Sequence, residues 1–378
     1  MKAVCHREAL LSACQLASVA VASRDVKPIL RNLKAIMEPQ RCTLMATDLE
    51  LGIRLEVRSV KVEEPGDAII PTSRMVSILR ESTDEELTVE ASRDACFVRG
   101  QFNEFEMPSE DPGNFPDIPS FTDENYHEIS SSVLREMIRR TQFAVAVGEG
   151  ARFSATTGIL LELEGDQAKL VGTDGRRLAL AQGPATAHGD HSTKGQMPVI
   201  PAKAMGLVER NLQEEDELVK ISVRPNEVLV KTERAMIYSR LVEGRFPPYA
   251  QVIPQKHPIK VPLVVGPFQT AVRQAAIMTD EESKRVVFAF AKHKLTLQAR
   301  GAETGRSRVE MPVGYDGKPI EISFDPKFLI DMLRILDPET PLTLELLDSN
   351  KPALFRNEAG NYLYVVVPLA VREKEQVP

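Results

Sequence analysis

The chain of 378 residues has no tryptophan, only 5% aromatic residues and no long apolar run. Proteins that bind single-stranded nucleic acid stack the bases on aromatic rings, and this composition supplies few such rings. A membrane span needs about 18 consecutive apolar residues, which no segment approaches. The apolar residues near the N-terminus are interrupted by His6, Arg7 and Glu8, so they predict a folded helix and not an export signal. We therefore expect a soluble, cytoplasmic protein with no membrane partner.

Cysteine is also scarce. The four cysteines, Cys5, Cys14, Cys42 and Cys96, all lie in the first third of the chain, with no CxxC spacing and no pair of histidines nearby. This pattern indicates neither a disulfide framework nor a zinc site. We expect buried, unreactive thiols in a protein of the cell interior.

Common catalytic signatures are missing. The sequence has no Walker-type phosphate loop, no GxSxG and no GxGxxG that opens a helix. Asp48 and Asp174, each preceded by threonine, have two interpretations: acid–base or metal-binding carboxylates, or residues that cap a turn through backbone N–H groups. We favour capping, because no histidine or second carboxylate recurs beside both.

Two histidines, His188 and His191, lie in the polar segment 186–193 and have the chemistry of metal ligands. No carboxylate or cysteine partner recurs around them, so we expect a solvated loop. The sequence thus predicts no catalytic residue, no metal site and no cofactor.

A weak internal repeat is the most informative feature of the sequence. Each of three copies runs through three strands to a helix opened by a proline, and then to another pair of strands. The strands alternate apolar and polar residues, as in 159–164, which is typical of a half-buried strand. Pro71, Pro201 and Pro326 stand at the predicted first helical positions, where a missing N–H has no cost. Asp325 is a predicted N-cap.

An amphipathic helix precedes each copy, predicted over 9–22, 132–145 and 267–278. Two helices and about eight short strands per copy predict an α+β domain. Segments rich in proline and aspartate, 109–124 and 247–262, are predicted linkers between the copies.

Four segments resemble the bacterial DNA polymerase III beta subunits, the beta sliding clamp family. They are FPDIP at 115–119, TDGRRL at 173–178, LVEGRFPPY at 241–249 and YVVVPL at 364–369. The similarity covers essentially the whole chain in the family's order. It implies three similar clamp domains, expected at 1–122, 128–252 and 255–378, each with two helices packed on antiparallel sheets.

The resemblance also implies an assembly. Two chains of this family join head to tail into a ring of six domains, with twelve helices around a central hole. Part of the dimer contact is expected at Arg74, Ile277 and Met278. Such a ring is a processivity factor and not an enzyme: it encircles duplex DNA and tethers a polymerase at high effective concentration.

The charge of the chain needs an explanation in this context. A formal net charge of −7 and a pI of about 5.6 are atypical of a nucleic-acid binder. Net charge is only a sum, however, and the predicted helices carry more Lys and Arg than Asp and Glu, which would attract phosphate without reading bases. The alternative is a solvated helix face with ordinary ion pairs, such as Glu136 with Arg140. The residues expected to face DNA are Arg24, Arg74, Arg80, Arg139, Phe153 and Lys203.

The family's peptide-binding pocket has the better-matched residues. Apolar walls with a few polar edges suit a short peptide with leucine and phenylalanine anchors. A plain domain–domain core is the alternative. The expected partners are the polymerase III alpha subunit, clamp loader subunits, and other DNA polymerases and repair proteins with motifs of the type Gln-Leu-x-Leu-Phe. The expected pocket residues are Thr173, Gly175, Arg177, Leu178, Pro247, Val252, Val365, Val367, Pro368 and Leu369.

Two other classes of function stay open on the sequence. One is a hydrolase or metal-dependent enzyme that uses Asp48 or Asp174, and the other is a monomeric scaffold that binds proteins but not DNA. A stable dimer without metal would count against the first, and a monomeric mass would support the second.

Overall fold

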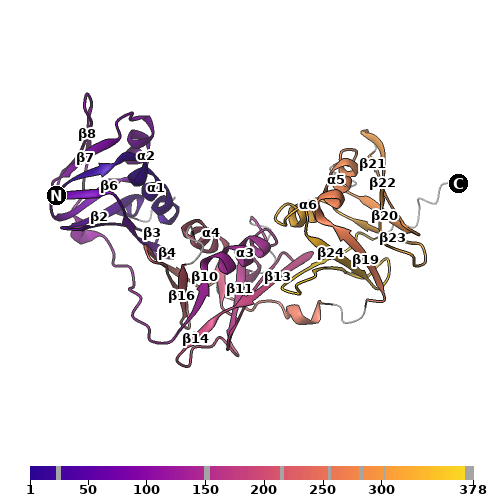
Figure 1. Ribbon diagram of the computed structural model, residues 1–378. Coiled ribbons are helices and arrows are strands. Elements are labelled where there is room, and N and C mark those ends of the chain that lie inside the picture. Colours follow the sequence, from indigo (N-terminus) through magenta and orange to yellow (C-terminus); the bar gives the residue numbers. More distant parts are fainter. Residues whose placement is uncertain are drawn as a thin grey trace.

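The computed structural model describes residues 1–22, 27–148, 154–212, 217–253, 257–280, 284–301 and 303–370. Three domains of like topology follow one another along an arc, and the helices lie along its concave side (Figure 1). The predicted fold class, α+β with two helices on antiparallel sheets in each domain, is confirmed.

Each domain repeats one order of elements: a strand, a helix, a set of strands, a second helix and a closing set of strands. The first domain contains β1 (Lys2–His6), α1 (Arg7–Ala17), β2 (Asn32–Glu38), β3 (Arg41–Thr47), β4 (Leu51–Val57), β5 (Val60–Glu64), β6 (Gly66–Pro71), α2 (Thr72–Glu81), β7 (Glu86–Ala91), β8 (Ala95–Arg99) and β9 (Glu104–Pro108). The second contains β10 (Tyr126–Ser130), α3 (Ser131–Gln142), β11 (Gly158–Glu164), β12 (Gln167–Thr173), β13 (Arg177–Pro184), β14 (Thr186–His188), β15 (Val199–Pro201), α4 (Ala202–Asn211), β16 (Leu218–Val223), β17 (Glu227–Lys231) and β18 (Ala235–Arg240). The third contains β19 (Ile259–Val264), α5 (Val265–Ala276), β20 (Val286–Ala291), β21 (Lys294–Gly301), β22 (Gly305–Pro312), β23 (Ile320–Phe324), α6 (Pro326–Leu333), β24 (Pro341–Leu346), β25 (Ala353–Asn357) and β26 (Tyr362–Val366).

Neighbouring domains share continuous sheets. A nine-stranded sheet joins the first domain to the second where β4 pairs with β18, and an eight-stranded sheet joins the second to the third where β13 pairs with β26. We call these two junctions the first seam and the second seam. A five-stranded sheet at one end of the chain and a four-stranded sheet at the other leave β9 and β22 at open edges.

The helix starts correct part of the sequence prediction. Pro71 and Pro201 are the last residues of β6 and β15 and flank the helices as N-caps, so their predicted place as first helical residues is wrong by one position. Their extended backbone continues the strand, since proline suits both a strand end and the turn into a helix. Pro326 is the first residue of α6, and the Asp325 side chain accepts a hydrogen bond from Lys327 N at 2.9 Å, as predicted.

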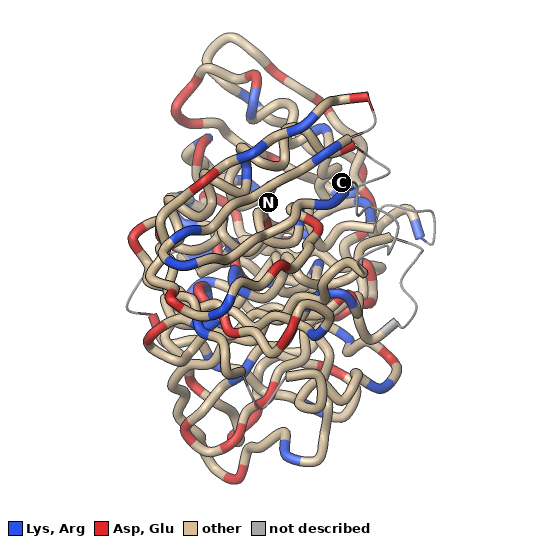
Figure 2. Tube along the Cα trace, turned by 90° about the vertical axis from the view of Figure 1, so that its right-hand side faces the viewer, with Lys and Arg blue, Asp and Glu red and all other residues tan. Residues whose placement is uncertain are grey.

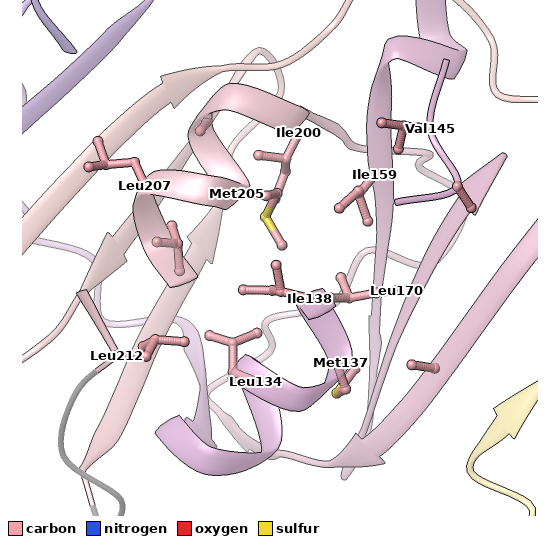
Figure 3. Close-up of a cluster of buried hydrophobic side chains, with 14 of the residues drawn as sticks. Leu134, Met137, Ile138, Val145, Ile159, Leu170, Ile200, Met205, Leu207 and Leu212 are labelled. Carbon is pink, nitrogen blue, oxygen red and sulfur yellow. The ribbon is translucent and has the colours of Figure 1, made fainter. Parts of the chain in front are cut away.

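The cores lie between the helices and the sheets. In the second domain, Leu134, Met137 and Ile138 of α3 face Met205 of α4 and the strand residues Ile159, Leu170 and Ile200 (Figure 3). In the first domain the four cysteines are free and buried, as predicted. Burial raises the pKa of Cys96 to about 11, because a thiolate loses its hydration there.

The second predicted linker, 247–262, extends too far along the chain, because its last four residues belong to a strand. Segment 109–125 has only a single 3₁₀ turn, at Pro112–Asn114, but residues 259–262 of the second segment belong to β19. Pro262 lies at the edge of its sheet, where the absence of an N–H breaks no ladder bond.

Candidate functional site

The two Thr-Asp pairs are turn caps. Asp48 Oδ1 accepts hydrogen bonds from the backbone N–H groups of Glu50 and Leu51, at 3.1 and 2.8 Å. Asp174 Oδ1 accepts from Arg176 and Arg177 N–H in the same way, at 2.9 and 3.0 Å. These bonds confirm the capping interpretation.

The histidine segment differs from the expected solvated loop. Residues 186–188 form the strand β14, and His188 Nε2 lies 2.9 Å from the Glu128 carboxylate. The His191 ring lies between His127 Nδ1, at 2.6 Å, and the N–H of Val223, at 3.0 Å. Side-chain hydrogen bonds of His188 and His191 with residues of β10 and β16 therefore order this segment. The described residues contain no group of three His, Cys, Asp or Glu side chains suited to a metal ion.

An apolar cluster covers the second seam on the face turned away from the helices. Leu178 of β13 and Val365 of β26 are direct cross-strand partners at its centre, and both are buried. We call this set the outer cluster: Ala155, Leu160, Val171, Leu178, Val199, Phe246, Leu354, Leu363 and Val365, with Leu180, Val242, Tyr249 and Ile253 packed against it.

The segment 241–253 lies over this cluster and brings further predicted residues to it. Phe246 is fully buried, whereas Val252 is 44% exposed. Val367, which follows β26, is 41% exposed, and its N–H donates to Arg176 O at 2.9 Å. The structure thus collects buried and exposed apolar side chains at one seam, which is the composition that an apolar peptide needs.

The other predicted pocket residues lie at the borders of the outer cluster. The Thr173 hydroxyl donates to Arg177 O at 2.6 Å, and Gly175 adopts φ +86° in the turn. Pro247 and Pro368 are half-buried. The N–H of Leu369 donates to Ser323 O at 2.8 Å, which leads the chain toward β23.

Arg177 lies on the opposite face of the sheet from Leu178. Its guanidinium contacts Asp174 at 3.0 Å, Asp331 of α6 at 2.8 Å and the carbonyl of Phe143 at 2.8 Å. Because side chains alternate along a strand, Arg177 points to the helices where Leu178 points to the outer cluster. It ties the second domain to the third.

Phe246, Tyr249 and Glu162 are not among the site residues predicted from the sequence. Tyr249 Oη donates a 2.8 Å hydrogen bond to Glu162 Oε2 of β11. The signal available in the sequence was a pair of aromatic residues in a proline-rich segment of a chain that is poor in aromatics.

The helices form the second candidate surface. The sequences of the six α-helices hold ten Lys and Arg residues and five Asp and Glu residues, although the whole chain is acidic. Across the rest of the molecule acidic and basic residues are intermixed (Figure 2).

The predicted DNA-facing residues differ in their surroundings. Arg74 and Arg80 are exposed on α2. Arg139 and Lys203 are also exposed, but Arg139 pairs with Glu209 and Lys203 pairs with Asp48, both at 2.7 Å. Arg24 and Phe153 lie outside the described residues.

Within the described segments, no helix combines the length and hydropathy that a membrane span needs.

Comparison with known proteins assigns all three domains of the chain to one family. Residues 1–119, 128–248 and 250–370 match the N-terminal, central and C-terminal domains of the DNA polymerase III beta subunit, respectively. A beta sliding clamp from Pseudomonas putida is 30% identical over 371 residues, which cover 96% of this chain and 98% of the relative. One from Chlamydia pneumoniae is 29% identical over 99% of this chain and all of the relative.

Solved structures agree. A sliding clamp from Pseudomonas aeruginosa bound to griselimycin superposes with a TM-score of 0.89 at 27% identity, over 98% of this chain and 100% of that one. The Bacillus subtilis sliding clamp has the same TM-score at 22% identity, which supports the fold alone. The chain belongs to the DNA polymerase III beta subunit family, the non-catalytic beta sliding clamps.

Proposed function

We propose that two copies of this chain close head to tail into a ring that encircles duplex DNA, and that the outer cluster tethers replication and repair proteins to it. The observation that carries this proposal is the pair of open edges, β9 and β22. In the repeat, β9 is equivalent to the seam strands β18 and β26, and β22 is equivalent to their partners β4 and β13. Domain limits of 1–122, 128–252 and 255–378 fit this repeat.

The repeat gives the register of the missing seam. Met107 of β9, Ser239 of β18 and Val366 of β26 are equivalent positions in the three domains. Each pairs at the same point with the preceding strand, β8, β17 or β25. At the first seam Ser239 lies opposite Leu51, and at the second seam Val366 lies opposite Arg177. The position on β22 that is equivalent to Leu51 and Arg177 is Gly305. Met107 of one chain should therefore lie opposite Gly305 of the next.

The two edges have complementary charges in this register. Glu106 comes opposite Arg306, and Glu104 comes opposite Arg308; all four side chains are exposed. Opposite charges on facing residues of antiparallel strands are stabilising, and like charges are not. Unpaired strand edges also favour pairing with another strand.

Apolar residues support the same interface. Phe105 comes opposite Ser307, whose hydroxyl donates to Ala275 O at the end of α5. Phe105 would therefore face the end of α5, where Ile277 is 70% exposed. Met278 is adjacent, and Arg74 is a further predicted contact. A head-to-tail contact closes after two copies if the rotation fits.

The concave side then becomes the lining of the hole. Arg74, Arg80, Arg139 and Lys203 would meet phosphates, which fixes no base sequence and permits sliding. Outside the six α-helices the chain carries more Asp and Glu than Lys and Arg, and this part would stay away from DNA. Arg24 and Phe153 complete the set of expected DNA residues.

The first seam supports the peptide site by analogy. There, Gly52 occupies the position of Leu178, and a Cβ on Gly52 would lie 3.0 Å from the Ile118 side chain. The linker residues Phe115 and Ile118 thus fill the first seam from within the chain. The second seam has exposed Val252 and Val367 instead, so we infer that an external peptide fills it.

The partners we propose follow from this site. Peptides of the type Gln-Leu-x-Leu-Phe supply leucine and phenylalanine anchors, and they would belong to the polymerase III alpha subunit, clamp loader subunits, and other polymerases and repair proteins. Residues Thr173, Gly175, Leu178, Pro247, Val252, Val365, Val367, Pro368 and Leu369 would form the site, with Arg177 behind it. We place the protein in the cytoplasm at the nucleoid.

Charge reversal tests the ring. The variants Arg306→Glu/Arg308→Glu and Glu104→Arg/Glu106→Arg each place like charges at both interfaces, so each alone should sediment as a monomer at low micromolar concentration. Mixed together, they restore opposite charges at both interfaces and should form a dimer.

The matched control is Glu63→Arg/Glu64→Arg on β5, at the other edge of the same five-stranded sheet. It makes the same change in charge as Glu104→Arg/Glu106→Arg and should stay dimeric. A monomeric wild-type protein, or reversal variants that stay dimeric alone, would contradict the proposed ring.

A further inference from the structure

One wall of the outer cluster is formed by chain without a regular element. Segment 241–253 crosses from the second domain toward the third, and its only described element is the 3₁₀ turn Tyr249–Gln251. Backbone bonds fix its start, from Leu241 N to Asn226 O and from Val242 N to Val199 O. Phe246 is then buried in the outer cluster.

Beyond Phe246, the backbone hydrogen bonds of the described residues lie within the turn, while the Ile253 side chain packs against the outer cluster. The N–H groups of Gln251 and Val252 donate to Pro248 O and Tyr249 O, which are bonds within the turn. Pro248, Ala250, Gln251 and Val252 are exposed. Besides the packing of Ile253, the turn that carries Val252 needs a tie to the sheet to fix its distance from Leu178.

The bond between Tyr249 and Glu162 is that tie. The Tyr249 ring packs against the outer cluster with its centroid 6.5 Å from that of Phe246, and its hydroxyl reaches Glu162 Oε2 at 2.8 Å. Glu162 stands on β11 and pairs across the sheet with Lys169 of β12, so it is part of the rigid sheet. A charge-assisted hydrogen bond to a strand residue is a firm anchor.

We propose that Tyr249 is a positioning residue for peptide binding: its bond to Glu162 holds the turn that presents Val252 at the distance from Leu178 that a bound apolar side chain requires. This inference rests on the proposed peptide site. Tyr249 acts through the turn and not by touching the peptide. The first linker is tied in the same manner, since Arg54 Nη2 donates to Ile118 O at 2.6 Å and Lys34 Nζ to Pro112 O at 3.3 Å.

The test is a double-mutant cycle on peptide affinity. A labelled Gln-Leu-Ser-Leu-Phe peptide is titrated against wild-type protein, Tyr249→Phe, Glu162→Leu and the double variant, and anisotropy is followed. The loss of one such hydrogen bond should weaken binding about fivefold in either single variant. The double variant should lose no more than a single one, because both remove the same bond.

Two further variants separate positioning from a general loss of structure. Glu162→Gln keeps an oxygen acceptor and should restore near-wild-type affinity. Tyr126→Phe removes the hydroxyl that Lys220 Nζ contacts at 3.3 Å in the same domain and should leave affinity unchanged. Faster amide hydrogen exchange at Gln251 and Val252 in Tyr249→Phe is the readout that reports the turn directly.

The outcomes are distinct. Wild-type affinity in Tyr249→Phe, or additive losses in the double variant, would overturn the positioning role alone. If the folded wild-type protein did not bind the peptide, both this role and the proposed peptide site would fall.

Discussion

Arg177 and Asp331 form an ion pair that joins two domains: Nη1 of the arginine lies 2.8 Å from Oδ2 of the aspartate. The Arg177 side chain is only 8% exposed, and its guanidinium also lies 4.8 Å from the centre of the Phe328 ring. The junction of the second and third domains therefore depends on one buried cation with several partners.

Removal of that cation should destabilise the chain strongly. Arg177→Ala leaves Asp174 and Asp331 without their shared partner, and breaking a buried pair costs about 3 kcal/mol of unfolding free energy. Urea unfolding measures the loss. Arg139→Ala, which breaks the exposed pair with Glu209, is the control and should cost less than about 1 kcal/mol. Equal losses in the two variants would show that the pair at the junction has no special role.

A charged side chain at the exposed edge of the outer cluster should weaken peptide binding. Val367→Asp places a charge where an apolar anchor would bury it, so affinity should fall at least about tenfold. Because Val367 is 41% exposed, the fold should be retained. Val264→Asp is the matched control, with the same 41% exposure at the end of β19. Anisotropy of a labelled peptide reports both, and unchanged binding by Val367→Asp would remove Val367 from the site.

Duplex DNA binding should depend on the helices. Each lost phosphate contact reduces the slope of log K against log salt by about 0.9. Arg74→Ala/Arg80→Ala should therefore flatten the slope by up to about 1.8 units. Arg93→Ala, in the β7–β8 turn of the same domain, should not change it. If Arg93→Ala flattened the slope and Arg74→Ala/Arg80→Ala did not, the DNA would bind elsewhere on the chain.

The histidine pair in the second domain should make stability depend on pH. Val223 N–H donates to His191 Nε2, so the His191 proton lies on Nδ1 and is donated to His127 Nδ1; His127 Nε2–H then donates to Gly165 O at 3.0 Å. A second proton on either ring has no acceptor in this chain of bonds. Burial accordingly lowers the pKa of both histidines, against opposing effects from Asp166 and Asp123.

The sign follows from those lowered values. Near and below pH 6.5 the unfolded chain binds protons that the folded chain refuses, so the free energy of unfolding falls as the pH drops. Each histidine contributes at most about 1.4 kcal/mol per pH unit. The midpoint of thermal unfolding should fall less between pH 7.5 and pH 5.5 in His191→Gln than in wild-type protein. His6→Gln, at an exposed position, should decline as wild type does; an unaltered decline in His191→Gln would exclude the pair as its source.

The sequence alone predicted the side-chain caps of turns and helices. The turn caps at Asp48 and Asp174 and the N-cap at Asp325 involve bonds to residues two or three positions away, so spacing alone specifies them. The repeat of strands and helices was legible for the same reason, because periodicity reflects which face of each element is buried. The predicted helix starts at Pro71 and Pro201 were wrong by one position, because proline fits the end of a strand as well as the start of a helix.

The tertiary structure decided what depends on partners distant in the sequence. His191 is ordered by His127, 64 positions away, and nothing in the polar segment around it predicts that contact. Arg177 and Leu178 are neighbours in one motif, yet the pleat of β13 sends one to the helices and the other to the outer cluster. The register of the seams is equally non-local, because strand pairing is fixed by two surfaces meeting and not by either strand alone.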